Sequence, residues 1–408
     1  MKKSLSMLLV IFMMVSLLAA CGDGGTSTPT DSAGSESSAA STRDYSTGPI
    51  VIGGVNDLSG NRSVTGNGIN RGAELAVNEI NTNGGILGRE VKFVPYDNKN
   101  DGQESINAYT RLADVDGASA VVTSDASSIC MTLIEISSQK GVPVVGMPSD
   151  PRATMDMDTG EPYPYMFLVD QPNAIGQADL IANYVNQNTD LDKAAVFYDQ
   201  SNAYAVANVE AFVKTWEALG HQVTLTETCN ANDQDYKTQL QKIKASDADF
   251  IYTPNPISQC VLLVQQANQI GLDIPYVGAM DMMDPFLSLL NDPAMVSKAY
   301  FPTAVWMEDS KLDTVAQAYE EAYNEIMQMK SVQGYDAVYI IKAAIEAANS
   351  ADPEAIRNAI ENDIVDLPLL VSDAYTQDPT THAPKDLGMV ICEIDNGVLL
   401  NKGFYAVP

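Results

Sequence analysis

Histidine, tryptophan and cysteine are scarce in this chain of 408 residues, which has two histidines, two tryptophans and five cysteines. The four cysteines after Cys21 have no CxxC spacing and only two histidines could join them, so we expect no metal site. Four cysteines allow three pairings, and the sequence does not choose among them. Buried free thiols are the expected state, and Cys229 with Cys260 is the one disulfide considered.

Basic residues are also few, with 23 Lys and Arg against 53 Asp and Glu and a formal net charge of −30. A chain this acidic is repelled by nucleic acid and by anionic lipid headgroups, so neither is an expected partner. The remaining composition, 45% hydrophobic and 19% charged residues, is that of an ordinary globular protein.

Motifs of the common enzyme classes are missing. The chain has no GxSxG elbow, no HExxH and no P-loop. Gly66-Asn67-Gly68 precedes a helical pattern, but Arg71 occupies the third glycine position of a dinucleotide fingerprint. Paired carboxylates for glycoside hydrolysis stay open, since acidic residues are plentiful. We expect a binding protein without a cofactor rather than an enzyme.

Only the N-terminus contains a long apolar run, from Leu5 to Ala20 after Lys2 and Lys3. A basic start, an apolar stretch and small residues before Cys21 resemble the bacterial lipoprotein signal, in which this cysteine is lipidated. Residues 1–20 are therefore the expected signal peptide, with an uncleaved membrane anchor as the alternative. Both alternatives place the rest of the chain outside the cytoplasm, anchored to the bacterial cell membrane. Residues 21–48, rich in small polar residues, are expected to form a flexible tether.

Strand and helix patterns alternate at intervals of about 25 residues through two series, which is typical of βαβ units and parallel sheets. The sequence predicts an α/β protein of two doubly wound parallel-sheet lobes. The expected strands are 50–55, 91–96, 118–123 and 142–147 in the first series, and 194–198, 223–227, 250–253 and 274–277 in the second.

Beyond residue 298 the pattern loosens into a strand at 300–304, helices near 315–329, 336–348 and 353–362, and a hairpin of 389–394 with 398–405 around Asp395-Asn396-Gly397. The tail is long enough to pack on both lobes. We expect an N-terminal lobe of 49–170 plus about 300–375, and a C-terminal lobe of 171–299 plus about 376–408. Gln171-Pro172 and Pro302-Thr303 are the candidate hinges.

Ala118–Ser128 is the stretch with the clearest chemistry. An apolar strand ends in small hydroxyl residues and a helical pattern begins, which leaves backbone N–H groups unpaired beyond the sheet edge. Together with Ser127 and Ser128 these groups suit a small anion such as a carboxylate. The alternative is that one serine only caps the helix.

Several short motifs, in order and spacing, resemble one known family. The chain is similar to the type 1 periplasmic binding proteins, specifically the ABC transporter lipoproteins that bind branched-chain and related amino acids, over essentially all of 49–408. The resemblance implies two lobes joined by three crossings that close over one ligand. Its motifs are Leu58-Ser59-Gly60, Gly72-Ala73-Glu74-Leu75-Ala76, Ile80-Asn81, Gly84-Gly85-Ile86, Gly141-Val142-Pro143, Asp235-Tyr236, Gly271-Leu272 with Pro275, Gly334-Tyr335-Asp336-Ala337-Val338-Tyr339, and Asp378-Pro379 with Thr381-His382.

The resemblance also implies ligand positions. The family's first-lobe serine matches Ser127, and its turn after the fourth strand matches Pro148-Ser149-Asp150. Its second-lobe tyrosine matches Tyr204, and its acidic residue matches Asp281 with an offset of one. Asp150 could instead cap the following turn, Asp281 could be a solvated loop acid, and Tyr204 could be core packing.

Two positions depart from the family pattern. Thr65 stands where many relatives have an aromatic residue, and Asn255-Pro256 where they often have tyrosine. A pocket with Thr65 in place of an aromatic is wider or more polar, which weakens the case for leucine-like specificity. We expect a monomer that captures an amino acid for an ABC transporter permease. The alternatives are a sensor that signals to a membrane receptor, or uptake of a small amide or other polar solute.

Overall fold

The computed structural model describes residues 43–407 except residues 284 and 386. The expected signal peptide, Cys21 and most of the expected tether lie outside the described residues. Within the described ranges, no helix has the length and apolar character needed to cross a membrane.

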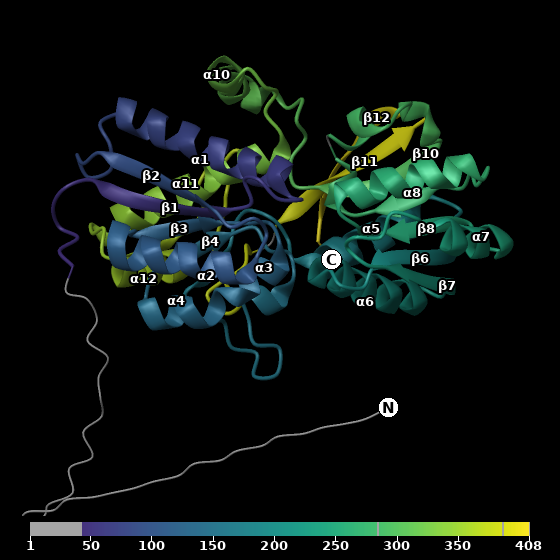
Figure 1. Ribbon diagram of the computed structural model, residues 1–408, viewed down its shortest axis with the longest axis horizontal. Coiled ribbons are helices and arrows are strands. Elements are labelled where there is room, and N and C mark those ends of the chain that lie inside the picture. The colour runs from purple at the N-terminus through teal and green to yellow at the C-terminus, as the bar shows by residue number, and fades with distance from the viewer. Residues whose placement is uncertain (1–42, 284, 386, 408) are drawn as a thin grey trace, which may run out of the picture. The chain divides into compact units, whose positions relative to one another are not determined.

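The first lobe is built on a sheet of five parallel strands in the order β2-β1-β3-β4-β5. Residues of α1, α11 and α12 share one core with this sheet, and residues of α2, α3 and α4 share another (Figure 1). The strands are β1 (Ile50–Asn56), β2 (Val91–Asp97), β3 (Ala120–Thr123), β4 (Val144–Gly146) and β5 (Met166–Leu168). The helices are α1 (Ser63–Thr82), α2 (Gly102–Arg111), α3 (Ser127–Thr132), α4 (Ile134–Lys140), α11 (Met329–Ala348) and α12 (Pro353–Asp363).

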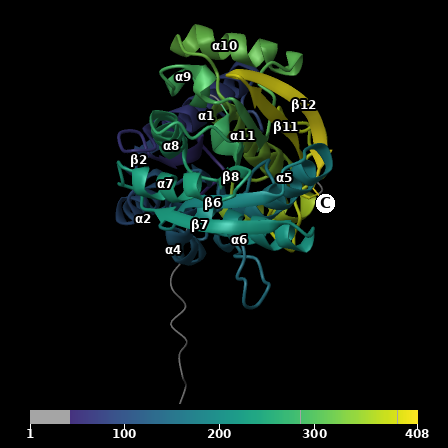
Figure 2. The ribbon, with the colours of Figure 1, turned by 90° about the vertical axis from the view of Figure 1, so that its right-hand side faces the viewer.

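The second lobe has a seven-stranded sheet in the order β12-β11-β10-β9-β8-β6-β7. Its strands are β6 (Lys193–Asp199), β7 (Gln222–Cys229), β8 (Phe250–Thr253), β9 (Tyr276–Gly278), β10 (Lys298–Thr303), β11 (Gly388–Asp395) and β12 (Val398–Ala406). The pairs β7-β6, β6-β8, β8-β9 and β9-β10 are parallel, whereas β10-β11 and β11-β12 are antiparallel. Figure 2 shows β12 along the outer edge. The predicted hairpin is confirmed, with Asn396 and Gly397 both at positive φ in its turn.

Helices cover both faces of the second sheet as well. Residues of α5 (Ala174–Asn188) and α6 (Ala203–Ala218) form a core with one face, and residues of α7 (Lys237–Ala245), α8 (Ile257–Gln269) and α9 (Phe286–Leu289) with the other. The doubly wound α/β architecture is therefore confirmed. Short 3-10 helices lie at Pro151–Ala153, Met280–Met282, Pro293–Met295 and Ser310–Leu312, and a π-helical turn at Leu112–Asp116.

The chain passes between the lobes three times, between β5 and α5, between β10 and α11, and between α12 and β11. The boundary expected near residue 300 is too early, because β10 pairs with β9 and β11 in the second sheet. The boundary expected at 375 is also too early. His382 stacks on Phe167 of β5 and its backbone carbonyl accepts from Leu168, so this segment packs on the first lobe until β11 begins.

The helix expected at 315–329 ends earlier than predicted, and the helix expected at 336–348 begins earlier. α10 (Asp313–Tyr323) ends where Asn324 adopts a left-handed conformation with φ 53°, a common way for a helix to stop. α11 begins at Met329.

Helices α1 and α11 cross at backbone contact. A Cβ atom on Gly72 would lie 1.9 Å from the carbonyl oxygen of Ser331, and one on Gly334 would lie 2.2 Å from that of Ile69. Only glycine allows this approach, so the two helices are held together as one unit.

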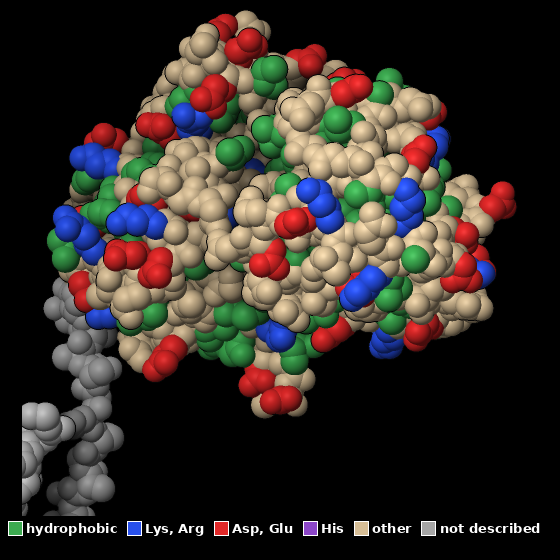
Figure 3. All heavy atoms as spheres, turned by 45° about the vertical axis from the view of Figure 1, so that its right-hand side comes forward, with side chains coloured by type: hydrophobic (Ala, Val, Ile, Leu, Met, Phe, Trp, Pro, Cys, Tyr) green, Lys and Arg blue, Asp and Glu red, His purple; other side chains and the backbone are tan. Residues whose placement is uncertain are grey.

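Cys229 and Cys260 are buried free thiols, so the disulfide considered between them is wrong. On the surface, acidic side chains are scattered among basic ones over the face drawn in Figure 3 rather than gathered in one patch.

Candidate functional site

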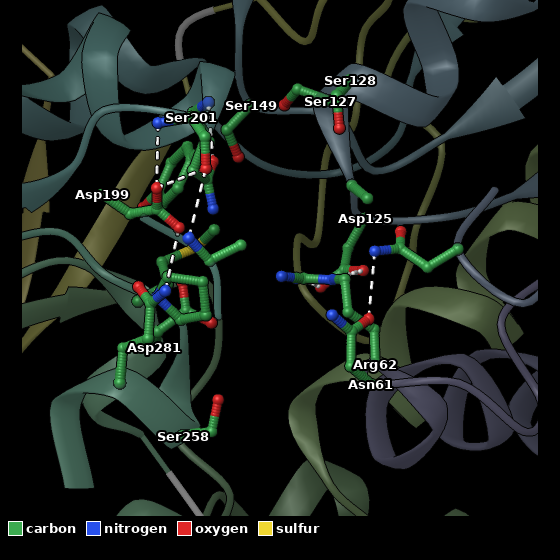
Figure 4. Close-up of a pocket in the computed structure, with 18 of the residues that line it drawn as sticks. Asn61, Arg62, Asp125, Ser127, Ser128, Ser149, Asp199, Ser201, Ser258 and Asp281 are labelled. Atoms are coloured by element: carbon green, nitrogen blue, oxygen red, sulfur yellow. Dashed lines mark hydrogen bonds and ion pairs between the residues drawn. The ribbon is translucent and has the colours of Figure 1, made fainter. Parts of the chain in front are cut away.

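A cavity of about 410 Å³ lies between the two sheets, at the carboxyl ends of their parallel strands. In open α/β sheets this end is where ligands bind, because the connecting loops leave a crevice there. Figure 4 shows Asp199, Ser201, Ser258 and Asp281 on one wall, opposite Asn61, Arg62, Asp125, Ser127 and Ser128 on the other. The lining segments follow β1, β2, β3 and β4 in the first lobe and β6, β7, β8 and β9 in the second, and α11 adds its first two residues.

The first wall carries an ion pair between Arg62, from the loop after β1, and Asp125, from the loop after β3. The Arg62 Nη2 lies 2.6 Å from the Asp125 Oδ2, and Nε lies 3.3 Å from Oδ1. Burial favours a neutral Asp125, but the guanidinium outweighs burial and holds the pKa of this carboxyl below its ordinary value. The pair is therefore charged, and Arg62 is fixed on the wall.

Lys330, in the first turn of α11, is the second cation of this wall. Its Nζ donates to the Oε1 of Gln333 at 2.8 Å. Burial lowers the pKa of the Lys330 ammonium, and the charges of Asp125 and Asp281 oppose that shift. Two of the three ammonium protons are left to interact with a solute.

Three buried glutamines form a relay of hydrogen bonds behind Ser149, which lines the cavity: Gln171, Gln177 and Gln333. Gln333 donates to the Oε1 of Gln171 at 2.7 Å, and Gln171 donates to the hydroxyl of Ser149 at 2.7 Å. Gln177, on α5 of the second lobe, donates to the same hydroxyl at 3.1 Å. The glutamine relay thus connects the first crossing and both lobes to Ser149.

The relay fixes the direction of the Ser149 hydroxyl. Its oxygen accepts from two amide groups, so its lone pairs are used and its own O–H must donate elsewhere. The Ser127 oxygen likewise accepts from the backbone N–H of Asp150 at 3.2 Å. Neither O–H has an acceptor among the described residues, and both line the cavity. The first wall therefore offers two serine donors and two cations.

The second wall presents acceptors. Asp199 is bound by Ser201, whose backbone N–H and hydroxyl reach Oδ1 at 2.9 and 2.6 Å, and by Gln259, whose Nε2 reaches Oδ2 at 2.8 Å. These contacts hold the Asp199 carboxylate in place. They also orient the Gln259 amide, since only its nitrogen can donate to a carboxylate.

Asp281, in the loop after β9, accepts no hydrogen bond from any residue that the structure describes. Burial raises the pKa of its carboxyl to about 6, with Arg62 and Lys330 opposing the shift and Asp125 adding to it. Such a carboxylate gains most from a cation that enters the cavity. The Asp281 carboxylate therefore has no hydrogen-bond donor until a solute supplies one.

Tyr204, in the first turn of α6, lines the cavity and is 8% exposed. Its hydroxyl donates to the Oε1 of Gln177 at 2.8 Å, which joins it to the glutamine relay. Burial and the Asp281 charge raise the pKa of Tyr204 well above its ordinary value, so it stays a neutral donor.

The structure brings most of the predicted positions together: Ser127, Ser128, Ser149, Tyr204 and Asp281 all line the cavity. Asp150 does not. Its carboxylate accepts from the backbone N–H of Arg152 at 2.9 Å and pairs with the Arg152 guanidinium at 2.6 Å, so it caps the turn, the alternative that the sequence left open. Thr65 does not line the cavity itself. Its hydroxyl donates to the carbonyl of Arg62, and it borders an adjoining space of about 20 Å³ that shares Asp281 and Lys330 with the cavity.

The sequence analysis missed Arg62, Asp125, Lys330, Asp199 and Gln259. All but Lys330 follow the carboxyl end of a predicted strand, and that shared position is a signal that could have selected them. Lys330 had no such signal, because it comes from the start of a helix.

Comparison with known proteins gives concordant matches. The family model for periplasmic binding proteins matches residues 49–397. The leucine-, isoleucine-, valine-, threonine- and alanine-binding protein of Pseudomonas aeruginosa is 26% identical over 302 residues, which covers 73% of this chain and 78% of that protein. A Leu/Ile/Val-binding protein of Rhizobium johnstonii is 26% identical over 320 residues, 77% of this chain and 83% of that one.

Solved structures agree. The branched-chain amino acid substrate-binding protein of Streptococcus pneumoniae, in complex with isoleucine, has a TM-score of 0.76 and 25% identity, covering 88% of this chain and 99% of that one. A solute-binding protein of R. palustris in complex with benzoate has the same TM-score at 18% identity, which supports the fold alone. Proteins of this family bind solutes outside the cytoplasm and are not enzymes. The chain belongs to the periplasmic binding protein family.

Proposed function

We propose that this chain captures an amino acid, of the branched-chain group or a related one, between its lobes and delivers it to the permease of an ABC transporter. The relatives named above, which bind such amino acids, support this proposal. So does the chemistry of the two walls. An α-amino acid has a carboxylate that needs donors and an ammonium that needs acceptors.

The observation that carries the proposal is the separation of these two needs across the cavity. The free O–H groups of Ser127 and Ser149 face a carboxylate from the first wall, with Arg62 and Lys330 nearby. On the second wall the unpaired carboxylate of Asp281 suits the ammonium. The first wall carries Arg62, Lys330 and Asp125, a net charge of +1. The second wall carries Asp199 and Asp281, a net charge of −2.

Closure follows from this separation. A solute that touches both walls binds the closed form more tightly than the open form, and only such a solute shifts the population between them. The crossing at Gln171-Pro172 is the proposed hinge, since the Gln171 amide donates to Ser149, which lines the cavity.

We further propose that Cys21 is lipidated and that 1–20 are removed as a signal peptide, so that a monomer is tethered to the outer face of the cell membrane. The support is the sequence pattern around Cys21. Replacing Cys21 by Ser should release the protein from the membrane fraction or leave it unprocessed. Unchanged lipid labelling of that variant would contradict the anchor.

A thermal-shift screen of the twenty amino acids, with urea and short peptides as further probes, tests the binding function. A ligand that binds only the folded state raises its melting temperature. Small-angle scattering of the same samples should show compaction, and mass spectrometry should recover the solute unchanged. Flat melting curves across the whole panel would contradict the proposal, and consumption of the solute would indicate an enzyme.

A further inference from the structure

The cavity lacks the side chains that usually hold an aliphatic group. Among the described residues that line it there is no Val, Leu, Ile, Phe or Trp. Pockets for apolar groups are lined mainly by such residues. Apart from Tyr204, two alanines, one proline and three methionines are the apolar part of the lining, and hydroxyls, amides and charged groups make up the rest.

The three methionines are already committed to other contacts. Met147, Met280 and Met329 are 0%, 4% and 6% exposed and belong to the cores of the two lobes. The sulfur of Met329 also accepts from the hydroxyl of Thr303 at 3.2 Å. They therefore close the floor of the cavity without forming an apolar compartment of their own.

Gln259 has a polar atom that needs a partner. This side chain is 6% exposed, and its Nε2 is fixed on Asp199 at 2.8 Å. Its Oε1 is buried and accepts no hydrogen bond from the described residues. Because Gln259 lines the cavity, an N–H or O–H group of a solute is the natural donor to this oxygen.

Ser258 precedes Gln259 in the first turn of α8, and its hydroxyl is on the same wall (Figure 4). Its side chain has no hydrogen bond to a described residue. The first turn of α8 thus presents an acceptor and a hydroxyl beside the proposed ammonium partner, Asp281.

We infer that the solute has a polar side chain, bearing a hydroxyl or a carboxamide that bonds to the first turn of α8, rather than a branched aliphatic one. The inference rests on the proposed function and narrows it. A polar side chain would give the buried Oε1 of Gln259 the hydrogen-bond donor that it lacks, whereas an aliphatic one would leave this oxygen unpaired and strip water from the exposed Ser258 hydroxyl. The difference in affinity should be roughly 10- to 100-fold.

Pairs of amino acids with similar shape and different polarity test this inference. Calorimetric titration would compare threonine with valine, asparagine with leucine, and glutamine with methionine. The polar member of the pair that fits should bind at least about tenfold more tightly. Equal or tighter binding by the apolar members overturns the inference and leaves the proposed function intact. Binding by none of the six, nor by the other proteinogenic amino acids, overturns both.

Variants locate the preference. Gln259→Met keeps the side-chain length and removes the amide, and should reduce the polar preference about tenfold. Gln266→Met is the matched control on the same helix, since Gln266 is also 6% exposed but does not line the cavity and bonds only to the backbone of Tyr236 and Gln234. Ser258→Ala changes an exposed side chain and cannot disturb the core, so it covers the case in which Gln259→Met does not fold. The assignment to α8 is overturned if Ser258→Ala keeps the polar preference and the two glutamine variants do not differ from each other. They would not differ if both kept the preference or if both lost it equally.

Discussion

The carboxyl groups of Asp170 and Asp336 interact in a fully buried position beside the first crossing between the lobes, where burial and the charge of Asp170 raise the pKa of Asp336 well above its ordinary value. Asp336 also accepts from the backbone N–H groups of Leu370 and Val371 at 2.9 and 3.0 Å, and Asp170 accepts from Gln333 at 3.1 Å. Two carboxylates so close cannot both be ionised, so the pair holds a proton. This proton lies next to the glutamine relay.

The stability of the protein should therefore depend on pH through Asp170. Burial raises the pKa of this carboxyl from 3.8 to about 6, against the hydrogen bond from Gln333. The folded state then binds the proton more tightly than the unfolded state, and the free energy of unfolding falls as pH rises from 3.8 to about 6. Asp170→Asn should lessen this fall by about 1–3 kcal/mol, measured by urea unfolding.

The Asp170→Asn amide can still donate to Asp336 and accept from Gln333, so the variant is expected to fold. Asp363→Asn, at an exposed acid that ends α12, is the control and should follow the parent protein. Parallel curves for the parent and Asp170→Asn would refute the shared proton.

Solute affinity should vary with pH through a different group, Asp281. Its pKa of about 6 means that the carboxylate, the form that attracts an ammonium, dominates only above that pH. Affinity should rise as pH increases through 6 and level off near 8, with a slope below 6 of up to about tenfold per pH unit. Asp281→Asn should bind about 10- to 100-fold more weakly at pH 8 and show a flat profile. Titration of Asp292→Asn, an exposed acid of the same lobe, gives the control.

Arg62 should be needed for stability as well as for binding. Its removal leaves the Asp125 carboxylate, whose side chain is 5% exposed, without its partner. Arg62→Met should lower the free energy of unfolding by about 1–3 kcal/mol, and the double variant with Asp125→Leu should lose less than the sum of the two single losses. Arg111→Met is the matched control. Arg111 is 62% exposed and 4.0 Å from Asp116, so its loss should cost less than about 0.5 kcal/mol.

The contact between α1 and α11 predicts opposite effects of one substitution at two sites. Gly72→Ala places a Cβ against the Ser331 carbonyl and should destabilise the protein by about 1–3 kcal/mol. Gly68→Ala, one turn earlier, meets no atom nearer than the Ser331 hydroxyl at 3.3 Å. There the better helix propensity of alanine should leave stability unchanged or raise it by up to about 1 kcal/mol. Thermal unfolding of both variants decides, and equal melting temperatures would contradict the backbone contact.

Much of the fold could be predicted, because each buried parallel strand is an apolar run and each covering helix has an apolar stripe. The failures have local causes. The three-residue strand β5 was not predicted, and Asn324 stops α10 in a conformation that many other residues avoid. The lobe boundaries were misplaced because they depend on strand pairing, which joins segments far apart in the chain.

The site was predicted less completely for a related reason. Ser127 was selected by its position after a strand and by the family resemblance, and Asp281 was selected by the resemblance. Arg62 acquires its role from Asp125, 63 residues away, and Lys330 reaches the cavity only because α11 returns to the first lobe. A pairing across such distances leaves no trace in local sequence.

The glycine crossing of α1 and α11 has one more consequence. Arg62 precedes α1, and Lys330 is in the first turn of α11. Because these two helices are packed at backbone contact, the two cations keep the same separation when the lobes open. The carboxylate of any solute therefore meets Arg62 and Lys330 in the same arrangement. A change of solute specificity would then need substitutions only on the second wall, chiefly in the first turn of α8, while the carboxylate site on the first wall stays the same.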